Sequence, residues 1–221
     1  MDPRFRHIWQ KLISHLSGDR PKSLYFMRHG RTALDPIHRS DGWLDFPLSD
    51  AGQVSLIPAE QVLKLVPIRK IYAPTLKRTT QSAEIMQSGI ISDPEIIPAD
   101  PAKTWNLGAL AGTPKKPNRE IVQHYIDCPD ETPEGGESLN DFRARFLPWL
   151  EARKAEVMNG DGPILVITSG SALREVSTQM YGNEDVLDLD EGGLMCLEPK
   201  GEEWTARVVL GHKDEDDELL S

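Results

Sequence analysis

The stretch that decides the class of fold is Pro163-Ile164-Leu165-Val166-Ile167-Thr168. Its apolar side chains follow one another without alternation, whereas a strand with one face in water alternates apolar and polar residues. A strand that is apolar on both sides is typical of a parallel sheet covered by helices on both faces. Residues 24–27, Leu-Tyr-Phe-Met, form another short apolar run that we interpret as a buried strand. The sheet is therefore expected to be largely parallel.

The rest of the chain alternates helix-like and strand-like segments around these two strands. Ser49 or Asp50 can cap a helix that is broken or restarted at Pro58. Ser138, with Asp141 three residues later, predicts the start of a long helix. Strands that alternate with helices predict an α/β three-layer sandwich, in which a largely parallel central sheet carries helices on both faces. Further strands are expected near residues 68–73, 96–97, 194–198 and 204–210, and further helices near residues 75–87, 119–126 and 172–180.

The length and the net charge of the chain limit how many domains it can form and which partners it can bind. A chain of 221 residues suffices for one large domain, and a net charge of −10 offers no broad basic surface for nucleic acid. We expect an N-terminal amphipathic helix in residues 1–20, one domain in residues 21–211 and a solvated acidic tail in residues 212–221. No apolar run approaches the roughly 20 residues that span a bilayer, and the N-terminus is too basic for a signal peptide. These features predict a cytoplasmic protein that does not bind membranes.

The N-terminal segment carries apolar side chains at the spacing of one helical face. We expect this face to pack on the chain's own domain or on a second copy, which would make a homodimer. Its basic polar face leaves binding to a membrane surface as the alternative. The apolar positions are Phe5, Ile8, Trp9, Leu12, Ile13 and Leu16.

Cysteine and histidine usage gives no sign of a metal site. Cys128 and Cys196 lie far apart without CxxC spacing, so both are expected to be reduced, structural thiols. No group of His, Cys and carboxylate residues stands out with metal-ligand spacing, and we expect no metal and no other cofactor. His38 and His124 fall in segments that could approach a pocket, but the simpler interpretation is that both are ordinary surface histidines.

Polar residues follow the predicted strands, where open α/β sheets bind their ligands. Arg28, His29 and Gly30 come directly after residues 24–27. A neutral imidazole can act as a nucleophile, and a guanidinium offers planar donors that match phosphate oxygens. Arg78 lies in the first turn of the helix after the second strand, and Ser169 follows residues 164–168. Arg28, His29 and Arg78 are therefore expected to converge on one anion site.

Together these segments resemble the histidine phosphatase superfamily, also called phosphoglycerate mutase-like. The resemblance runs in order from about Leu24 to Gly193. It implies a phosphohistidine at His29 and a small phosphorylated substrate, without a cofactor. It also implies that Arg28, Arg78, Gly30 and Thr32 bind phosphate. The matching motifs are Arg28-His29-Gly30, residues 45–49 followed by Gly52, residues 73–83 and residues 135–138.

Two positions depart from the family pattern. Ser169 stands where a second histidine is expected, and serine donates one hydrogen bond but carries no charge. Losing such a donor from a transition-state pocket costs on the order of 3 kcal/mol. Thr104 stands where many members have the glutamate that protonates the leaving group. Asp100 and Glu137 are candidate replacements for this acid, and Glu137 is the tentative assignment.

The sequence therefore predicts a phosphatase, a phosphomonoester hydrolase that is impaired by the loss of the second histidine. One alternative is a catalytically silent relative that binds a phosphorylated ligand or a protein partner. A mutase is less favoured, because residues 78–108 are short and lack the long insertion found in cofactor-dependent mutases. Another interpretation is that Ser169 itself replaces a native histidine.

Overall fold

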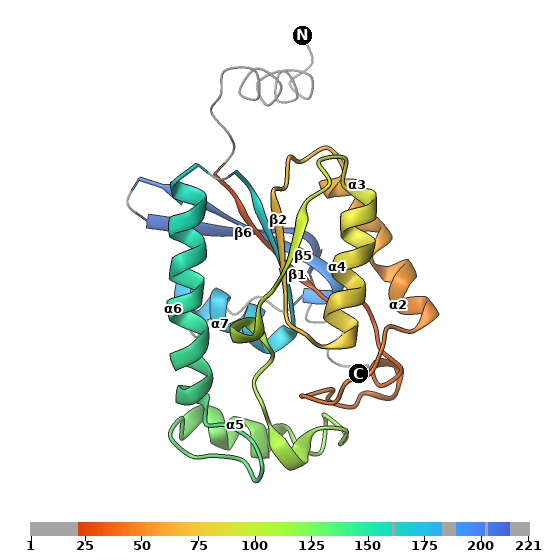
Figure 1. Ribbon diagram of the computed structural model, residues 1–221. Helices are drawn as coiled ribbons and strands as arrows, with labels where there is room; N and C mark the ends of the chain where they lie inside the picture. Colours follow the sequence, from red (N-terminus) through yellow and green to blue (C-terminus); the bar gives the residue numbers. More distant parts are fainter. Residues whose placement is uncertain (1–21, 161, 183–188, 202, 213–221) are drawn as a thin grey trace.

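A six-stranded mixed sheet forms the centre of the molecule (Figure 1). The computed structural model describes residues 22–160, 162–182, 189–201 and 203–212. The strand order is β3-β2-β4-β1-β5-β6, and the first four of these strands are mutually parallel. The last two form an antiparallel hairpin beside β1. The strands are β1 (Leu24–Arg28), β2 (Lys70–Ala73), β3 (Glu95–Pro98), β4 (Ile164–Thr168), β5 (Leu189–Lys200) and β6 (Glu203–His212).

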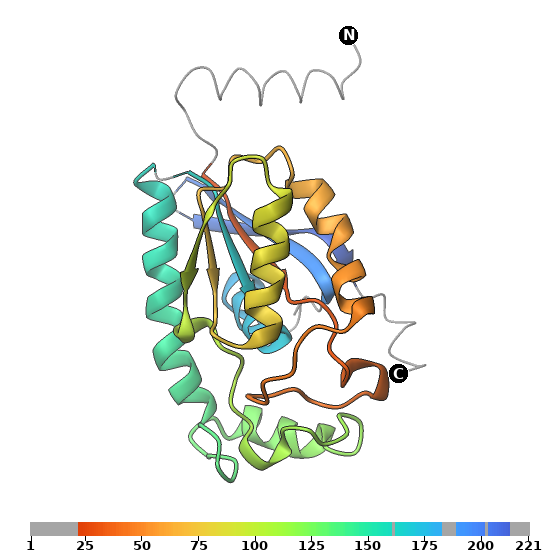
Figure 2. The same cartoon turned by 45° about the vertical axis from the view of Figure 1, so that its right-hand side comes forward.

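Helices cover both faces of this sheet, as Figures 1 and 2 show from two sides. On one face lie α2 (Asp50–Ser55), α3 (Ile57–Leu63) and α4 (Lys77–Gly89), and on the other lie α6 (Leu139–Met158) and α7 (Gly170–Tyr181). The expected three-layer α/β sandwich is confirmed. Helix α5 (Arg119–Asp127) lies beyond the carboxyl ends of the parallel strands. Short 3-10 turns are η1 (Asp35–Ile37), η2 (Asp100–Ala102) and η3 (Gly108–Leu110).

The two faces of the sheet build two separate cores, which explains the non-alternating strands. In β1, Leu24 and Phe26 join the core under α6 and α7, whereas Tyr25 and Met27 join the core under α2, α3 and α4. The residues of β4 divide in the same way. Fully burying one such apolar side chain contributes about 1.5–3 kcal/mol. Both central strands are therefore anchored from both sides, and their carboxyl ends form a rigid platform.

Local signals set the beginnings of the helices. Gly52 donates its backbone N–H to Ser49 Oγ, which caps α2, and α3 starts afresh with Pro58 in its first turn. Ser138 and Asp141 form the expected reciprocal capping box at the start of α6. The expected helix after β2 begins at Lys77 and ends at Gly89.

The closing strands and the terminal segments differ in how far the structure tests their predicted bounds. Strand β5 extends well beyond residues 194–198, because its pairing with β6 continues through polar residues, whereas β6 agrees with the predicted residues 204–210 to within two residues at each end. The predicted N-terminal helix and acidic tail lie almost wholly outside the described residues. Among the helices that are described, none combines the length and the apolar character needed to cross a membrane.

Candidate active site

The carboxyl ends of β1 and β4 bring His29 and Ser169 next to each other. Arg28 is paired with Thr168 in the parallel ladder, and the His29 N–H donates to the Thr168 carbonyl at 2.9 Å. His29 and Ser169, which follow this pair, therefore leave their strands at the same edge of the sheet. Both side chains are buried, with exposed fractions of 3% for His29 and 7% for Ser169. This is the edge at which parallel sheets bind ligands.

Hydrogen bonds fix both the orientation and the tautomer of the His29 ring. Its Nδ1 lies 2.9 Å from the Gly30 carbonyl oxygen, which can only accept, so Nδ1 carries the proton. Its Nε2 accepts from Nε of Arg78 at 3.2 Å. Burial lowers the pKa of His29 well below its ordinary value of 6.5, and the positive charges of Arg78 and Arg28 lower it further. The ring is thus a neutral imidazole whose Nε2 lone pair faces a guanidinium.

Gly30 holds this ring in place through a close backbone contact. A Cβ atom at position 30 would lie 2.4 Å from the Gly52 carbonyl oxygen, so no larger residue fits without shifting the chain. The Gly30 N–H instead donates to Ser82 Oγ of α4 at 3.2 Å. Gly30 therefore acts through the packing of the loop that carries His29.

Arg78 is almost wholly buried and is oriented by the loop that precedes α2. Its Nη1 donates to the Leu44 carbonyl at 2.8 Å and its Nη2 to the Gly42 carbonyl at 2.7 Å. Burial lowers the pKa of Arg78, and the nearby Asp41 opposes this effect. Together with the contact to His29, all three nitrogen atoms of the guanidinium donate hydrogen bonds to fixed partners, and these bonds set its orientation.

Thr32 is fully buried among carboxylates. Its hydroxyl lies 2.8 Å from Oδ1 of Asp41 and 3.2 Å from Oδ2 of Asp35, and its N–H donates to Oδ2 of Asp35 at 2.6 Å. Burial raises the pKa of Asp41 against the opposing charge of Arg78, and Asp35 raises it further. Two acidic groups therefore lie behind Arg78 and offset part of its positive charge.

Arg28 is held by a carboxylate of the protein itself. Its Nη1 donates to the Leu189 carbonyl at 2.6 Å, and its Nη2 lies 2.5 Å from Oε1 of Glu191. Arg31 approaches the other oxygen of Glu191 at 3.5 Å. A Cβ at Gly170, the first residue of α7, would lie 3.8 Å from the Arg28 Cζ. The guanidinium thus lies at the N-terminus of α7 and faces an internal anion.

The two departures from the family pattern meet in the structure. The Thr104 hydroxyl lies 2.8 Å from the Ser171 hydroxyl, which in turn lies 3.3 Å from the Ser169 hydroxyl. Ser171 also accepts from the Trp105 N–H at 3.1 Å. Two neutral hydroxyls, linked through Ser171, therefore stand where the resemblance implies a histidine and a glutamate.

Comparison with known proteins identifies the family. The sequence pattern of the histidine phosphatase superfamily (branch 1) matches residues 24–210. The chain belongs to this superfamily.

Several relatives show the range of activities within the family. A 2,3-bisphosphoglycerate-dependent phosphoglycerate mutase of Chlamydia caviae is 26% identical in an alignment 224 residues long, which covers 86% of this chain and 97% of the mutase. The Danio rerio fructose-2,6-bisphosphatase TIGAR B is 28% identical over 148 residues, which cover 65% of this chain and 57% of that protein. A mycobacterial glucosyl-3-phosphoglycerate phosphatase, solved in complex with VO3, superposes with a TM-score of 0.71 at 19% identity, covering 87% of this chain and 99% of that one. This last likeness shows the shared fold.

Glu137, the residue tentatively assigned as the acid of this histidine phosphatase superfamily member, forms an ion pair with Arg145. Arg145 donates from Nη2 to Oε1 at 2.6 Å and from Nε to Oε2 at 2.9 Å, and Oε1 also accepts from the Asn106 N–H at 2.8 Å. Arg145 further donates to the carbonyls of residues 101, 103 and 104. This geometry gives Glu137 a role in anchoring the loop that carries Thr104.

Asp100, the other candidate acid, caps the turn before α4. Its Oδ1 accepts from the N–H and hydroxyl of Thr75, and its Oδ2 pairs with Lys103 at 2.9 Å. Partial burial raises the pKa of Asp100, but the hydrogen bonds from Lys103 and Thr75 outweigh it, and the net pKa lies below the usual value. A carboxyl in that state is a poor proton donor at neutral pH.

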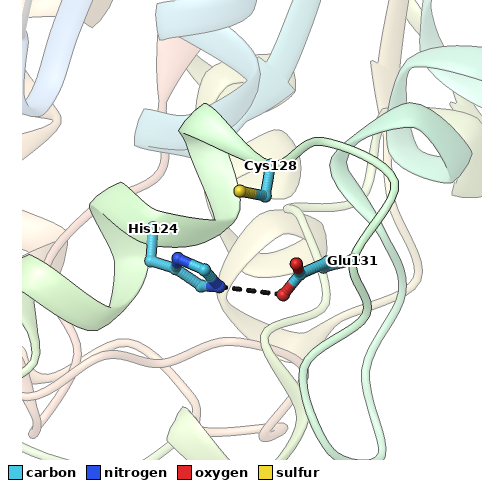
Figure 3. A group of neighbouring side chains, drawn as sticks. All are labelled: His124, Cys128 and Glu131. Carbon is cyan, nitrogen blue, oxygen red and sulfur yellow. Dashed lines mark hydrogen bonds and ion pairs between the residues drawn. The ribbon is translucent and has the colours of Figure 1, made fainter.

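The two other histidines that the sequence analysis considered, His38 and His124, differ in their surroundings. His38 is exposed in a left-handed turn, with a φ of 51°. His124 is exposed on α5, but the structure brings it together with Cys128 and Glu131 (Figure 3). The expectation that no such group exists is therefore wrong for these three residues. The His-x3-Cys spacing was present in the sequence, but the turn that adds Glu131 left no local signal.

Proposed function

We propose that this protein is a phosphatase that hydrolyses a small phosphomonoester in the cytoplasm through a phosphohistidine at His29. The observation that carries the proposal is the state of the His29 ring. It is buried and neutral, its Nδ1–H is anchored to the Gly30 carbonyl, and its Nε2 faces Arg78 at 3.2 Å. A nucleophile has to present such a lone pair, and the neighbouring guanidinium is suited to an incoming phosphoryl oxygen.

The proposed reaction has two displacements at phosphorus. In the first, His29 Nε2 forms a bond to phosphorus while the bond to the leaving oxygen breaks and that oxygen departs. In the second, water attacks phosphorus, the phosphorus–nitrogen bond breaks, and the neutral imidazole is restored. Arg78 and Arg28 would stabilise the charge on the equatorial oxygens, which is most of what phosphoryl transfer requires of a protein.

The proton for the leaving oxygen is the weak point of this mechanism. Thr104, Ser169 and Ser171 offer hydroxyls there, while Glu137 and Asp100 are engaged in ion pairs. Hydroxyl groups can donate a hydrogen bond but remain poor acids. We therefore expect the activity to favour leaving groups of low basicity, such as phenols that carry electron-withdrawing groups.

A phosphatase is favoured over a mutase among the activities of the family. Named relatives include both a phosphoglycerate mutase and a fructose-2,6-bisphosphatase. Residues 78–108 run directly from α4 through β3 to the loop that carries Thr104, and they contain only short turns beyond those elements. A mutase has to retain its phosphorylated ligand for a second transfer, and this segment adds little cover for that purpose.

A second candidate function is the binding of a phosphorylated ligand or a protein partner without catalysis. The observation that favours it is the chain of hydroxyls formed by Thr104, Ser171 and Ser169, because hydroxyls are poor acids for a leaving group. The ion pair between Arg28 and Glu191 competes with any phosphate for that guanidinium, so within this second candidate it favours a protein partner over a phosphorylated ligand.

Steady-state hydrolysis of an activated aryl phosphate by the native protein, Ser169→His, His29→Ala and the double variant tests the two candidates. Ser169→His should raise kcat by roughly 10- to 1000-fold, because an imidazole donor would act where transition-state charge develops. His29→Ala should abolish turnover in both backgrounds, and acid-labile phosphate should be trapped on protein only when His29 is present. If the native protein is inactive and Ser169→His stays at the His29→Ala baseline, the binding function replaces the phosphatase.

A further inference from the structure

Three side chains with metal-ligating atoms meet at the C-terminal end of α5, outside the site described above (Figure 3). The ring nitrogen of His124, the Sγ of Cys128 and a carboxylate oxygen of Glu131 all lie within 4.8 Å of one another. His124 Nε2 is 2.8 Å from Glu131 Oε2. His124 and Glu131 are exposed and Cys128 is half-buried, so an ion could enter directly from solvent.

Backbone hydrogen bonds hold these three positions in place. His124 and Cys128 are four residues apart on one face of α5, and the Cys128 N–H donates to the His124 carbonyl at 2.8 Å. The chain then turns at Pro129, and the Glu131 N–H donates to the Cys128 carbonyl at 2.9 Å. The turn is tied to the start of α6, because the Asn140 N–H donates to the Pro129 carbonyl at 3.0 Å.

We propose that His124, Cys128 and Glu131 bind a zinc ion. One imidazole, one thiolate and one carboxylate form a ligand set that suits Zn²⁺, and an exposed three-residue site leaves the fourth tetrahedral position to water. Two nitrogen or oxygen ligands of a tetrahedral zinc ion lie about 3.3 Å apart. The present 2.8 Å between His124 and Glu131 therefore has to widen by about half an ångström, which two exposed side chains can provide.

Charge and proton balance also favour zinc. On binding, Cys128 releases its thiol proton to water and His124 binds as the neutral ring, so a thiolate and a carboxylate neutralise the two charges of the ion. Asp127 and Asp130 add negative charge on either side of Cys128. Without metal, the contact between His124 and Glu131 is an exposed pair of the kind that contributes little stability. The bound ion would link α5 to the turn that leads into α6.

Metal titration of the full-length, untagged, reduced protein tests this site. Co²⁺ should bind with one-to-one stoichiometry and give the strong visible bands of a tetrahedral ion together with a sulfur-to-cobalt charge-transfer band. Zn²⁺ should displace it and raise the melting temperature. Because losing an outer-shell partner already costs 10- to 100-fold in metal affinity, losing a direct ligand should cost at least as much. Cys128→Ser and Glu131→Gln should each weaken binding by that factor or more.

A matched control variant separates this site from other histidines. His38→Asn removes an exposed histidine in a left-handed turn, a conformation that asparagine tolerates, and it should leave binding unchanged. Absence of stoichiometric binding to the native protein would overturn the proposal. Binding that persists in Cys128→Ser would overturn it as well, since the ion would then lie elsewhere. None of these measurements depends on phosphatase activity.

Discussion

His29 is a single residue whose protonation state controls the chemistry that we propose. The unfolded chain binds a proton at this ring near pH 6.5, whereas the folded chain does so only at a much lower pH. Between those two values the unfolded state holds more protons, so stability falls as the pH drops below about 6.5 toward the lowered pKa.

The first prediction follows from that difference in pKa. In a ¹³C-edited NMR titration, the His29 ring should stay neutral, with its proton on Nδ1, from pH 8 to below pH 6, and kcat/KM should show no loss from this group near pH 6.5. A midpoint near 6.5 for His29 would contradict the burial and the opposing guanidinium charges that define the site.

Glu191 is a second residue with a measurable effect, because it neutralises Arg28. Glu191→Gln keeps an oxygen near the guanidinium but removes the negative charge. We expect vanadate or inorganic phosphate to bind about tenfold more tightly, since a hydrogen bond to a charged group contributes about 1.5–3 kcal/mol and part of it becomes available to the ligand.

The matched control for this change is Glu198→Gln, which removes a charge from the same strand at an exposed pair with Arg207. Isothermal titration of both variants with the native protein separates a local effect from a change in net charge. Equal affinities for all three proteins would show that Glu191 does not compete with the ligand.

At the scale of elements, helix α6 positions the loop that carries Thr104. Arg145 connects the helix to three carbonyls of that loop and to Glu137. Lysine cannot reproduce this planar fork of donors. Arg145→Lys should therefore lower the free energy of unfolding by about 2–3 kcal/mol in urea titrations. Arg119→Lys on α5 is the control and should change it by less than about 0.5 kcal/mol. Equal stability of the two variants would mean that the loop does not depend on Arg145.

The elements also show which features can be predicted from the sequence. The non-alternating runs of β1 and β4 and the capping residues of α2 and α6 are local signals, and these elements were predicted correctly. The full length of β5 was not, because it results from pairing with β6. The ladder of β5 is irregular between Leu189 and Leu194, the part that presents Glu191. The position of Glu191 beside Arg28 therefore could not be predicted from a periodic sequence pattern.

The site was predictable to a similar degree. His29 and Arg78 each follow a buried strand, so their approach could be expected from topology alone. The contact between Thr104 and Ser171 joins residues 67 positions apart and depends on the packing of the Thr104 loop against the first turn of α7. The ion pair between Glu137 and Arg145 likewise could not be predicted from the sequence, because an acidic residue before a helix can also cap that helix or lie in solvent.

At the scale of the whole molecule, the apolar face of residues 3–17 is expected to pack on protein. Deleting residues 1–18 should therefore lower the melting temperature or dissociate a homodimer, because burying such side chains contributes about 25 cal/mol per Å². Light scattering coupled to size exclusion, together with thermal unfolding, measures both effects. If neither changes and the deletion instead abolishes co-sedimentation with anionic vesicles, the segment binds membranes.

The position of β1 in the sheet has a consequence for how the protein is made. Although β1 is the first strand within the described residues, it lies between β4 and β5, so that Leu24 pairs with Ile164 on one side and with Leu197 on the other. A ribosome that adds about 5–20 residues per second needs roughly 10–30 s to synthesise these partners. Throughout that interval the apolar residues 24–27 emerge without the strands that flank them, and such exposed apolar segments are prone to aggregate unless chaperones bind them. His29, which follows β1, therefore acquires its environment only after β4 and β5 have been made.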